Sequence, residues 1–247
     1  MTRHVLLDNV THKNLRVRTA LEKGRGYDVN VVRVFPSEFG HLQREYPLFF
    51  VKNAESGHFE TIALLGFVDR ENLYLTGTGW EADYVPLTVQ RQPFLIGFQE
   101  QVVDGVPRQA PVVHVDLDHP SVGDTEGEPV FLPHGGESPY LERVNSILAA
   151  IRQGHEASRS LSQLLVGLEL IESIALNVEF DDGSKQSLGG LYTINQDKLR
   201  GLSANGLEVL HGRSHLRDIY MMLASLLNVK RLVEKKNRLL SRARGTA

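Results

Sequence analysis

The residues with the most chemical promise occupy one short segment, His114-Val115-Asp116-Leu117-Asp118-His119. On a β-strand, alternate side chains share a face, so His114, Asp116 and Asp118 would project together. A histidine and a carboxylate two residues apart resemble part of the facial triad that binds non-haem iron, whose third ligand comes from elsewhere. The same alternation is typical of an edge strand with one polar face. A metal-dependent enzyme that uses His114 and Asp116 is therefore our alternative hypothesis.

A second group of residues suits binding rather than catalysis. Trp80, which is the only tryptophan, is followed at short intervals by Tyr84 and Arg91. These three residue types are favoured anchors of protein interfaces. They equally suit a packed corner of the core, where the tryptophan N–H finds a partner. We expect Trp80, Tyr84 and Arg91 to form the binding site if the protein captures a partner.

Other catalytic signatures are absent from the sequence. There is no phosphate-binding loop, no glycine-rich dinucleotide motif and no nucleophile elbow. His155-Glu156 begins like a zinc-protease helix, but Arg159 stands where the second histidine is required. The chain has no cysteine, which excludes disulfides, thiolate catalysis and cysteine metal sites. We therefore expect no cofactor, and we favour a non-enzymatic role while leaving the enzyme hypothesis open.

The elements that must position these residues differ between the two halves of the chain. Short apolar runs between turn residues predict strands in the first half. A short helix is predicted at 37–45, with Ser37 as its N-cap and Pro47 after its end. The predicted strands are 29–34, 48–51, 61–68, 73–75, 94–98 and 112–117.

The second half has a helical period. Ser138-Pro139 predicts a helix start, and Gly154 predicts its end, with another helix following. Alternating residues around Asp182-Gly183 predict a β-hairpin over 174–194. Asn195 is expected to cap a short helix. An apolar stripe from Leu216 to Leu227 predicts a long C-terminal helix with basic last turns.

These elements predict an α+β fold. We expect a strand-rich part at 1–118, an acidic connection rich in glycine and proline at 119–138, and a helical part at 139–247 that contains the hairpin. A single domain overall is the other arrangement that this length allows, since 247 residues suit one large domain or two small ones.

Charge is distributed unevenly. The formal net charge is −3, yet residues 1–34 and 230–247 are both basic. We expect these ends to fold against the acidic remainder, with contact between the basic C-terminus and a membrane surface as the alternative. Nucleic acid is not an expected partner, because the basic run at 230–247 has no aromatic residue for base stacking.

The N-terminus does not predict export. Asp8 and Asn9 interrupt its apolar residues at once, unlike a signal peptide. The most apolar stretches, 62–68 and 161–171, are far shorter than the ~18 residues that a membrane span needs. A transmembrane segment is therefore not expected, and we expect a cytoplasmic protein.

Short motifs are distributed along nearly the whole chain. They are His12-x-x-Leu15-Arg16-Val17, Glu38-Phe39, Tyr46-Pro47, Phe50-x-Lys52, Ala63-Leu64-Leu65-Gly66, Glu71-Asn72-Leu73, Gly79-Trp80-x-Ala82-x-Tyr84-Val85-Pro86, Arg91-x-Pro93-Phe94, Asp116-x-Asp118-x-Pro120, Ser138-Pro139-Tyr140-Leu141, Asp182-Gly183 and Gly190-Leu191-Tyr192-x-Ile194 with Lys198-Leu199. Taken together, these motifs resemble the SapC family of bacterial proteins. The resemblance includes Asp116 and Asp118 but not His114.

The resemblance implies an accessory role. The family is associated by name with surface layers, and its members are often met near genes for outer-membrane receptors and flavin halogenases. Our leading hypothesis is therefore a non-enzymatic accessory or interaction protein, associated with the surface layer or with outer-membrane uptake. It would bind a protein partner through Trp80, Tyr84 and Arg91.

Overall fold

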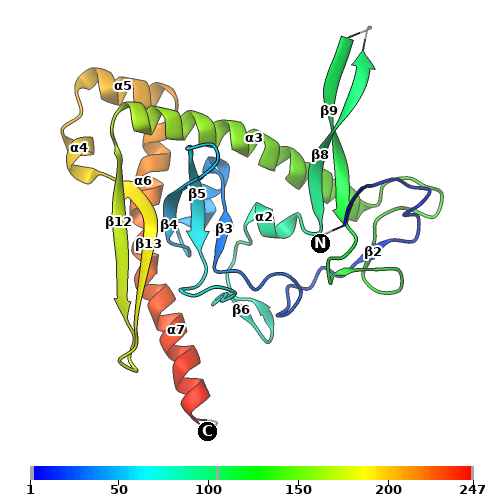
Figure 1. Cartoon of the computed structure of the whole chain (residues 1–247), viewed down its shortest axis with the longest axis horizontal. Helices are drawn as coiled ribbons and strands as arrows, with labels where there is room; N and C mark the ends of the chain where they lie inside the picture. Colours follow the sequence, from blue (N-terminus) through cyan, green and yellow to red (C-terminus); the bar gives the residue numbers. More distant parts are fainter. Residues whose placement is uncertain (1–2, 104–105, 246–247) are drawn as a thin grey trace. The chain divides into compact units, whose positions relative to one another are not determined.

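The structure is a computed structural model that describes residues 3–103 and 106–245. It contains both helices and antiparallel sheets, which confirms the predicted α+β class (Figure 1). The chain divides into two compact units whose segments alternate along the sequence, whereas the predicted parts follow one another. Unit 1 comprises Met1–Tyr27, Leu75–Trp80 and Leu87–Arg152, and unit 2 comprises Asp28–Tyr74, Glu81–Pro86 and Gln153–Ala247.

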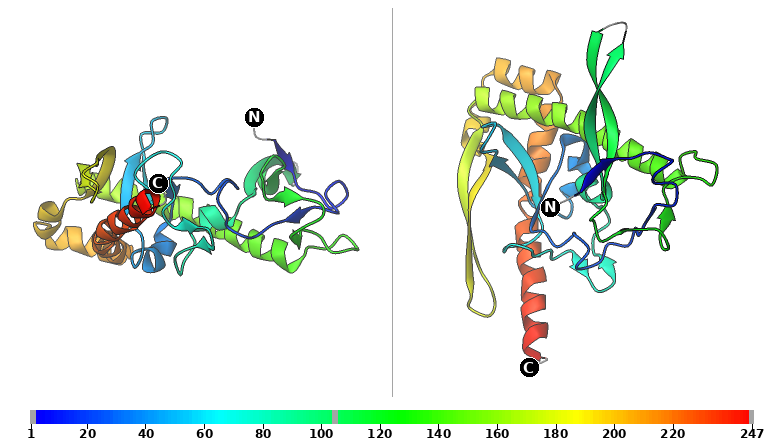
Figure 2. Two further views of the ribbon diagram at one scale, coloured as in Figure 1. Left: turned by 90° about the horizontal axis from the view of Figure 1, so that it is seen from below. Right: turned by 45° about the vertical axis from the view of Figure 1, so that its right-hand side comes forward.

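The main sheet of unit 1 is built on a long β-ribbon. β8 (Phe94–Val103) pairs antiparallel with β9 (Val106–Asp116), and β1 (His4–Leu6) pairs with the last residues of β9. Both strands extend well beyond the predicted 94–98 and 112–117. Figure 2 shows the ribbon twisting along its length, as paired strands do because of backbone sterics.

A second, smaller sheet of unit 1 includes the segment that we expected to be a connection. β2 (Arg16–Val17) lies between β10 (Val122–Gly123) and β11 (Glu128–Pro129), antiparallel to both. Residues 119–138 therefore contribute two short strands to unit 1. Their glycine and proline residues provide the turns between those strands.

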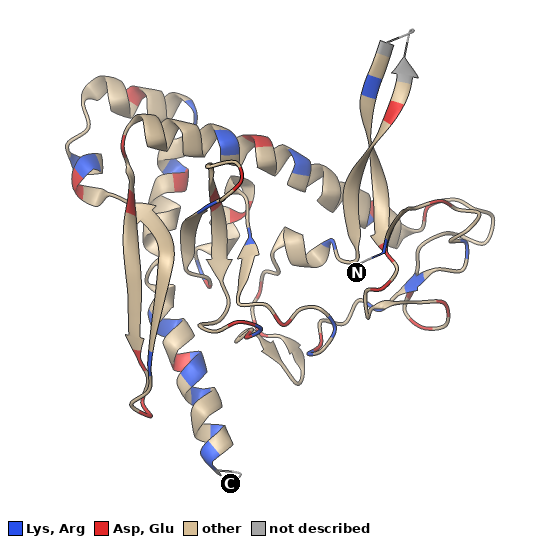
Figure 3. Ribbon diagram, viewed as in Figure 1, with Lys and Arg blue, Asp and Glu red and all other residues tan. Residues whose placement is uncertain are grey.

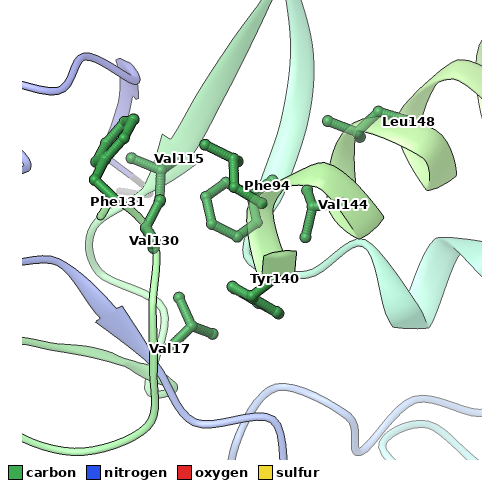
Figure 4. Close-up of a cluster of buried hydrophobic side chains, with 9 residues drawn as sticks. Val17, Phe94, Val115, Val130, Phe131, Tyr140, Val144 and Leu148 are labelled. Carbon is green, nitrogen blue, oxygen red and sulfur yellow. The ribbon is translucent and has the colours of Figure 1, made fainter. Parts of the chain in front are cut away.

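The core of unit 1 joins both sheets to the first part of helix α3 (Pro139–Gly167). Figure 4 shows Phe94 from β8 lying between Val115 and Val144. The ring of Phe94 is fully buried and lies 6.1 Å from that of Tyr140. The cluster consists of Val17, Phe94, Val115, Val130, Phe131, Tyr140, Leu141, Val144 and Leu148.

Unit 2 is organised around an antiparallel five-stranded sheet with the order β12-β13-β4-β5-β3. The predicted hairpin is present as β12 and β13, and it carries a bulge where the register shifts between Ile174 and Leu176. Gly190 at that bulge has a φ of 73°, a left-handed conformation that glycine adopts without strain. The strands are β3 (Val31–Arg33), β4 (Leu48–Lys52), β5 (Phe59–Leu64), β12 (Ile171–Glu179) and β13 (Lys185–Ile194).

The first helix of unit 2 differs from its prediction. A 3-10 turn at Pro36–Glu38 leads into α1 (Phe39–Leu42), so Ser37 lies within the helical turn and does not cap it. The backbone N–H of Phe35 instead donates to the Glu38 carboxylate over 3.0 Å. The capping interaction at this helix start therefore comes from the Glu38 side chain and not from Ser37.

Helix α3 does not end at Gly154, so the prediction of two helices was wrong. Ser138 caps the helix as expected, because its hydroxyl accepts from the N–H of Leu141 over 3.2 Å. Gly154 is a point of close packing instead. A Cβ there would lie 2.5 Å from Cγ of Phe35, so glycine is required by space and not by helix termination.

Within the described residues 195–245, the C-terminal region contains four helices. Asn195 caps the first of them as predicted, accepting from the N–H of Lys198 over 2.8 Å. The predicted long C-terminal helix is present as the last helix, but a turn at Leu226 and Leu227 separates it from the helix that carries most of the apolar stripe 216–227. The Asn228 amide donates to the carbonyls of Gln43 and Tyr46. The helices are α4 (Gln196–Arg200), α5 (Ala204–Gly212), α6 (His215–Ser225) and α7 (Asn228–Gly245).

Helix α7 carries the basic run, and much of that charge is used within unit 2. Lys and Arg recur along the helix in Figure 3. Lys235 pairs with Glu81 over 2.9 Å and Lys236 with Glu71 over 2.5 Å, and both lysine side chains are largely buried. For these two lysines, the basic C-terminal run therefore folds against acidic residues of the same chain, as predicted.

No helix in the described part of the chain has both the length and the apolar character needed to cross a bilayer.

Candidate functional site

Trp80 lies on a two-residue strand of unit 1. β7 (Gly79–Trp80) pairs with β6 (Leu75–Thr76), which places Trp80 opposite the buried Leu75. Trp80 buries most of its area, as an aromatic side chain of this size usually does, and a smaller part of it is exposed.

Arg91 follows the short helix α2 (Leu87–Gln90) and also belongs to unit 1. Its guanidinium donates to the carbonyl of Phe94, the first residue of β8. Burial lowers the pKa of Arg91, although a guanidinium remains charged at neutral pH. Arg91 therefore orients the start of β8 and presents only part of its side chain to solvent.

Tyr84 belongs to unit 2 and has an internal role there. Its ring stacks on that of His41 at 4.9 Å, and its hydroxyl donates to Glu38 over 3.1 Å. The Glu38 side chain is almost completely buried. Burial, followed by the nearby Glu38 charge, raises the pKa of Tyr84.

The three predicted binding residues are thus divided between the units, with Trp80 and Arg91 in one and Tyr84 in the other. Each is partly exposed. Tyr84 and Arg91 have partners that explain their positions by local structure alone. Trp80 pairs with Leu75 and is partly exposed.

His114 and Asp116 share a face of β9, as predicted. His4 on β1 lies opposite Asp116, with 3.9 Å between Nε2 and the carboxylate. His114 lies over Gly97, where a Cβ would be 2.1 Å from the imidazole ring, and its Nδ1 has no hydrogen-bond partner among the described residues. No three His, Asp or Glu side chains in the described ranges form a metal-binding group. The described residues therefore provide no third ligand that would complete an iron site with His114 and Asp116.

The rest of that segment has structural partners. Asp118 lies 4.0 Å from Arg3, in an exposed pair. His119 contacts the side-chain oxygen of Gln92 over 3.0 Å and packs edge-on against Tyr27. Burial lowers the pKa of His119. These contacts connect the end of β9 to neighbouring segments of unit 1.

The sequence analysis missed a polar group between α3 and α6 in unit 2. His215 lies 3.3 Å from Asp218 through Nδ1 and 3.3 Å from the Ser160 hydroxyl through Nε2. The order is that of a hydrolase triad, but both His215 and Asp218 are less than a tenth exposed. The three-residue spacing of His215 and Asp218 on one helix could have indicated that these two side chains meet. Ser160 could not have been added from the sequence, because it is 55 residues from His215.

The sequence analysis also missed a pocket of about 310 Å³ in unit 2. It lies among β3, β5, the turn between β4 and β5, and the C-terminal half of α3. His155, Glu156 and Arg159, which we had set aside as an incomplete zinc-protease motif, all line it. The full lining is Arg33, Phe35, Ser56, His58, Phe59, Glu60, Thr61, His155, Glu156, Ser158, Arg159 and Ser162.

Comparison with known protein families gives one result. The model of the SapC family matches residues 7–232. No curated protein and no solved structure matches the chain.

Proposed function

Since the chain belongs to the SapC family along almost its whole length, we propose that it is an accessory protein that acts by binding a protein partner. The proposed setting is the surface layer or outer-membrane uptake, and the proposed role is non-enzymatic. We also propose that the protein works from the cytoplasm. Contact of the basic C-terminus with a membrane surface remains a secondary proposal.

The observation that carries this proposal is the partial exposure of Trp80. Tryptophan contributes disproportionately to protein interfaces because it buries a large area and carries one hydrogen-bond donor. Trp80 presents this combination on a short β-ribbon, with Arg91 elsewhere in the same unit. Tyr84 and Arg91 complete the proposed binding residues, through the parts of their side chains that their internal contacts leave exposed.

The test replaces the Trp80 side chain and measures partner capture. A photo-crosslinking residue at position 80 identifies the partner in native cells, and the affinity of that purified partner is then measured with wild type and Trp80→Ala. We expect Trp80→Ala to weaken binding by at least about tenfold, the effect of an interface anchor worth more than about 1.4 kcal/mol.

Phe98→Ala provides the matched control. Phe98 is an aromatic residue of the same unit and is 63% exposed, so its loss should leave both fold and binding unchanged. Equal affinities for wild type and Trp80→Ala would refute the proposal. Unfolding of Trp80→Ala, read from circular dichroism, would assign Trp80 to the core.

No observation favours the metal-dependent alternative strongly enough to propose it as a second function. His4 approaches Asp116, but the described residues do not bring His114 into a group of three ligands with them.

A further inference from the structure

We propose that the pocket of unit 2 binds a small organic monocarboxylate, with Arg159 and Ser158 as the groups that hold its carboxylate. This site is independent of the protein-binding surface proposed above. Its volume of about 310 Å³ is at the lower end of the range for ligand pockets. The proposed ligand is therefore small.

The first step of the argument is that two donors in the pocket have no partner within the protein. The Ser158 hydroxyl is buried and makes no hydrogen bond to any described residue. The Arg159 guanidinium also has no ion pair or hydrogen bond among the described residues, and its side chain is exposed in the pocket. Buried polar groups are nearly always hydrogen-bonded, so an unpaired hydroxyl requires an explanation.

The second step is that several neighbouring polar groups are already occupied. Arg33 pairs with Glu60, which also accepts from the Asn53 amide over 3.2 Å. The Ser162 hydroxyl donates to the Arg159 carbonyl over 3.2 Å. Arg159 and Ser158 thus leave a cation and a hydroxyl on successive residues of α3, and a carboxylate accepts from both. The exposed His58 imidazole, in the turn between β4 and β5, is a further donor of the pocket.

The third step concerns the charge of the ligand. Glu156 lies one helical turn before Arg159 and lacks a cation within salt-bridge distance among the described residues. A carboxylate in that position repels anions, and repels a doubly charged group more than a singly charged one. This favours a monocarboxylate over a phosphate monoester.

The fourth step is the apolar side of the pocket. Phe59 is partly exposed and packs edge-on against Tyr192 with ring centroids 4.9 Å apart. Phe35 is fully buried and supports the His155 ring at 4.9 Å. Phe59 therefore provides a rigid apolar surface for the remainder of an organic anion, and Phe35 holds the His155 ring beside it from within the core.

The test is a titration of the full chain with benzoate, followed by ¹H–¹⁵N chemical shifts, with neutral benzamide as the matched ligand. We expect saturable shifts at residues 56–61 and 155–162, and at least about tenfold weaker binding of benzamide, because charge-assisted hydrogen bonds to arginine are roughly twice as strong as neutral ones. Phenyl phosphate should bind more weakly than benzoate.

Two variants, each of which removes one charge of the pocket, show whether the carboxylate of the ligand binds at Arg159. Arg159→Gln should abolish the preference for benzoate, and Glu156→Gln should tighten benzoate binding. Ser158→Ala should weaken binding without lowering the thermal midpoint, because the hydroxyl has no partner to lose. Arg152→Gln, the same substitution at an exposed site of α3 outside the pocket, should change nothing.

Three results would overturn the proposal. They are binding of benzoate no tighter than that of benzamide, an unchanged affinity in a folded Arg159→Gln variant, and tighter binding of phenyl phosphate than of benzoate. The Trp80 variants keep this pocket intact, so failure of the partner-binding proposal would leave these results unaffected.

Discussion

At the scale of single residues, the environment of a side chain decides which of its properties matter. Gly154 illustrates this, since its sequence context suggested a helix end whereas the helix continues through it. The absence of a side chain there allows Phe35 to approach the backbone of α3. Glycine is needed at position 154 because it is small, and its conformational freedom, which would end a helix, is not used there.

We predict that Gly154→Ala destabilises the protein. The added methyl group would meet Cγ of Phe35 at 2.5 Å, and overpacking of a core typically costs about 1–3 kcal/mol. Chemical denaturation measures the change. Gly212→Ala is the control, because a Cβ at that helical position meets nothing within 4 Å; it should be neutral or stabilising by up to about 1 kcal/mol. A stable Gly154→Ala variant would show that α3 and Phe35 can separate without penalty.

At the scale of elements, the sequence predicted what local patterns determine. The hairpin, the Asn195 cap and the Ser138 cap are confirmed because alternation and capping depend on neighbouring residues. The lengths of α3, β8 and β9 were not predicted. Extension of β8 and β9 rests on mutual pairing, which compensates for the polar residues at 99–101 that lack a strand pattern.

The candidate sites show the same division. The shared face of His114 and Asp116 followed from the strand period, whereas His4 reaches Asp116 through a pairing more than 100 residues distant. The pocket of unit 2 could not be predicted, because its lining comes from three segments that only the sheet topology and α3 bring together.

We predict that the Ser160, His215 and Asp218 group holds α3 and α6 together and does not catalyse acyl transfer. Asp218→Asn leaves the size unchanged but removes the charge that faces His215 and Arg217, and should cost about 1–3 kcal/mol in chemical denaturation, as for other buried hydrogen bonds to charged groups. Glu208→Gln, at an exposed site in α5, is the control. Covalent labelling of Ser160 by a fluorophosphonate, found by mass spectrometry, would contradict this structural role.

At the scale of the whole molecule, buried and half-buried tyrosines make both units sensitive to alkali. Burial is the leading cause of a raised pKa for Tyr27 and Tyr140 in unit 1 and for Tyr74 and Tyr84 in unit 2. In the unfolded chain these phenols ionise near the ordinary value of 10.0. The folded state retains their protons to higher pH.

We therefore predict that the free energy of unfolding decreases as pH rises above about 10. In that range the unfolded state binds fewer protons than the folded state, so stability falls with pH; below it the contribution is fully present. Urea denaturation between pH 9 and 11 measures the slope. Tyr74→Phe should make the slope shallower, and Tyr220→Phe, which alters an exposed tyrosine, should not. Identical slopes for wild type and Tyr74→Phe would contradict the prediction.

The alternation of segments between the two units has a consequence for synthesis on the ribosome. Unit 1 requires residues up to Arg152, so its first segment must wait until the chain has returned from unit 2. The central strands β4 and β5 of unit 2 emerge early, but their neighbour β13 and helices α6 and α7 are made last. During translation unit 1 can close first, while the apolar strands of unit 2 remain exposed to chaperones and to aggregation until β13, α6 and α7 have been made.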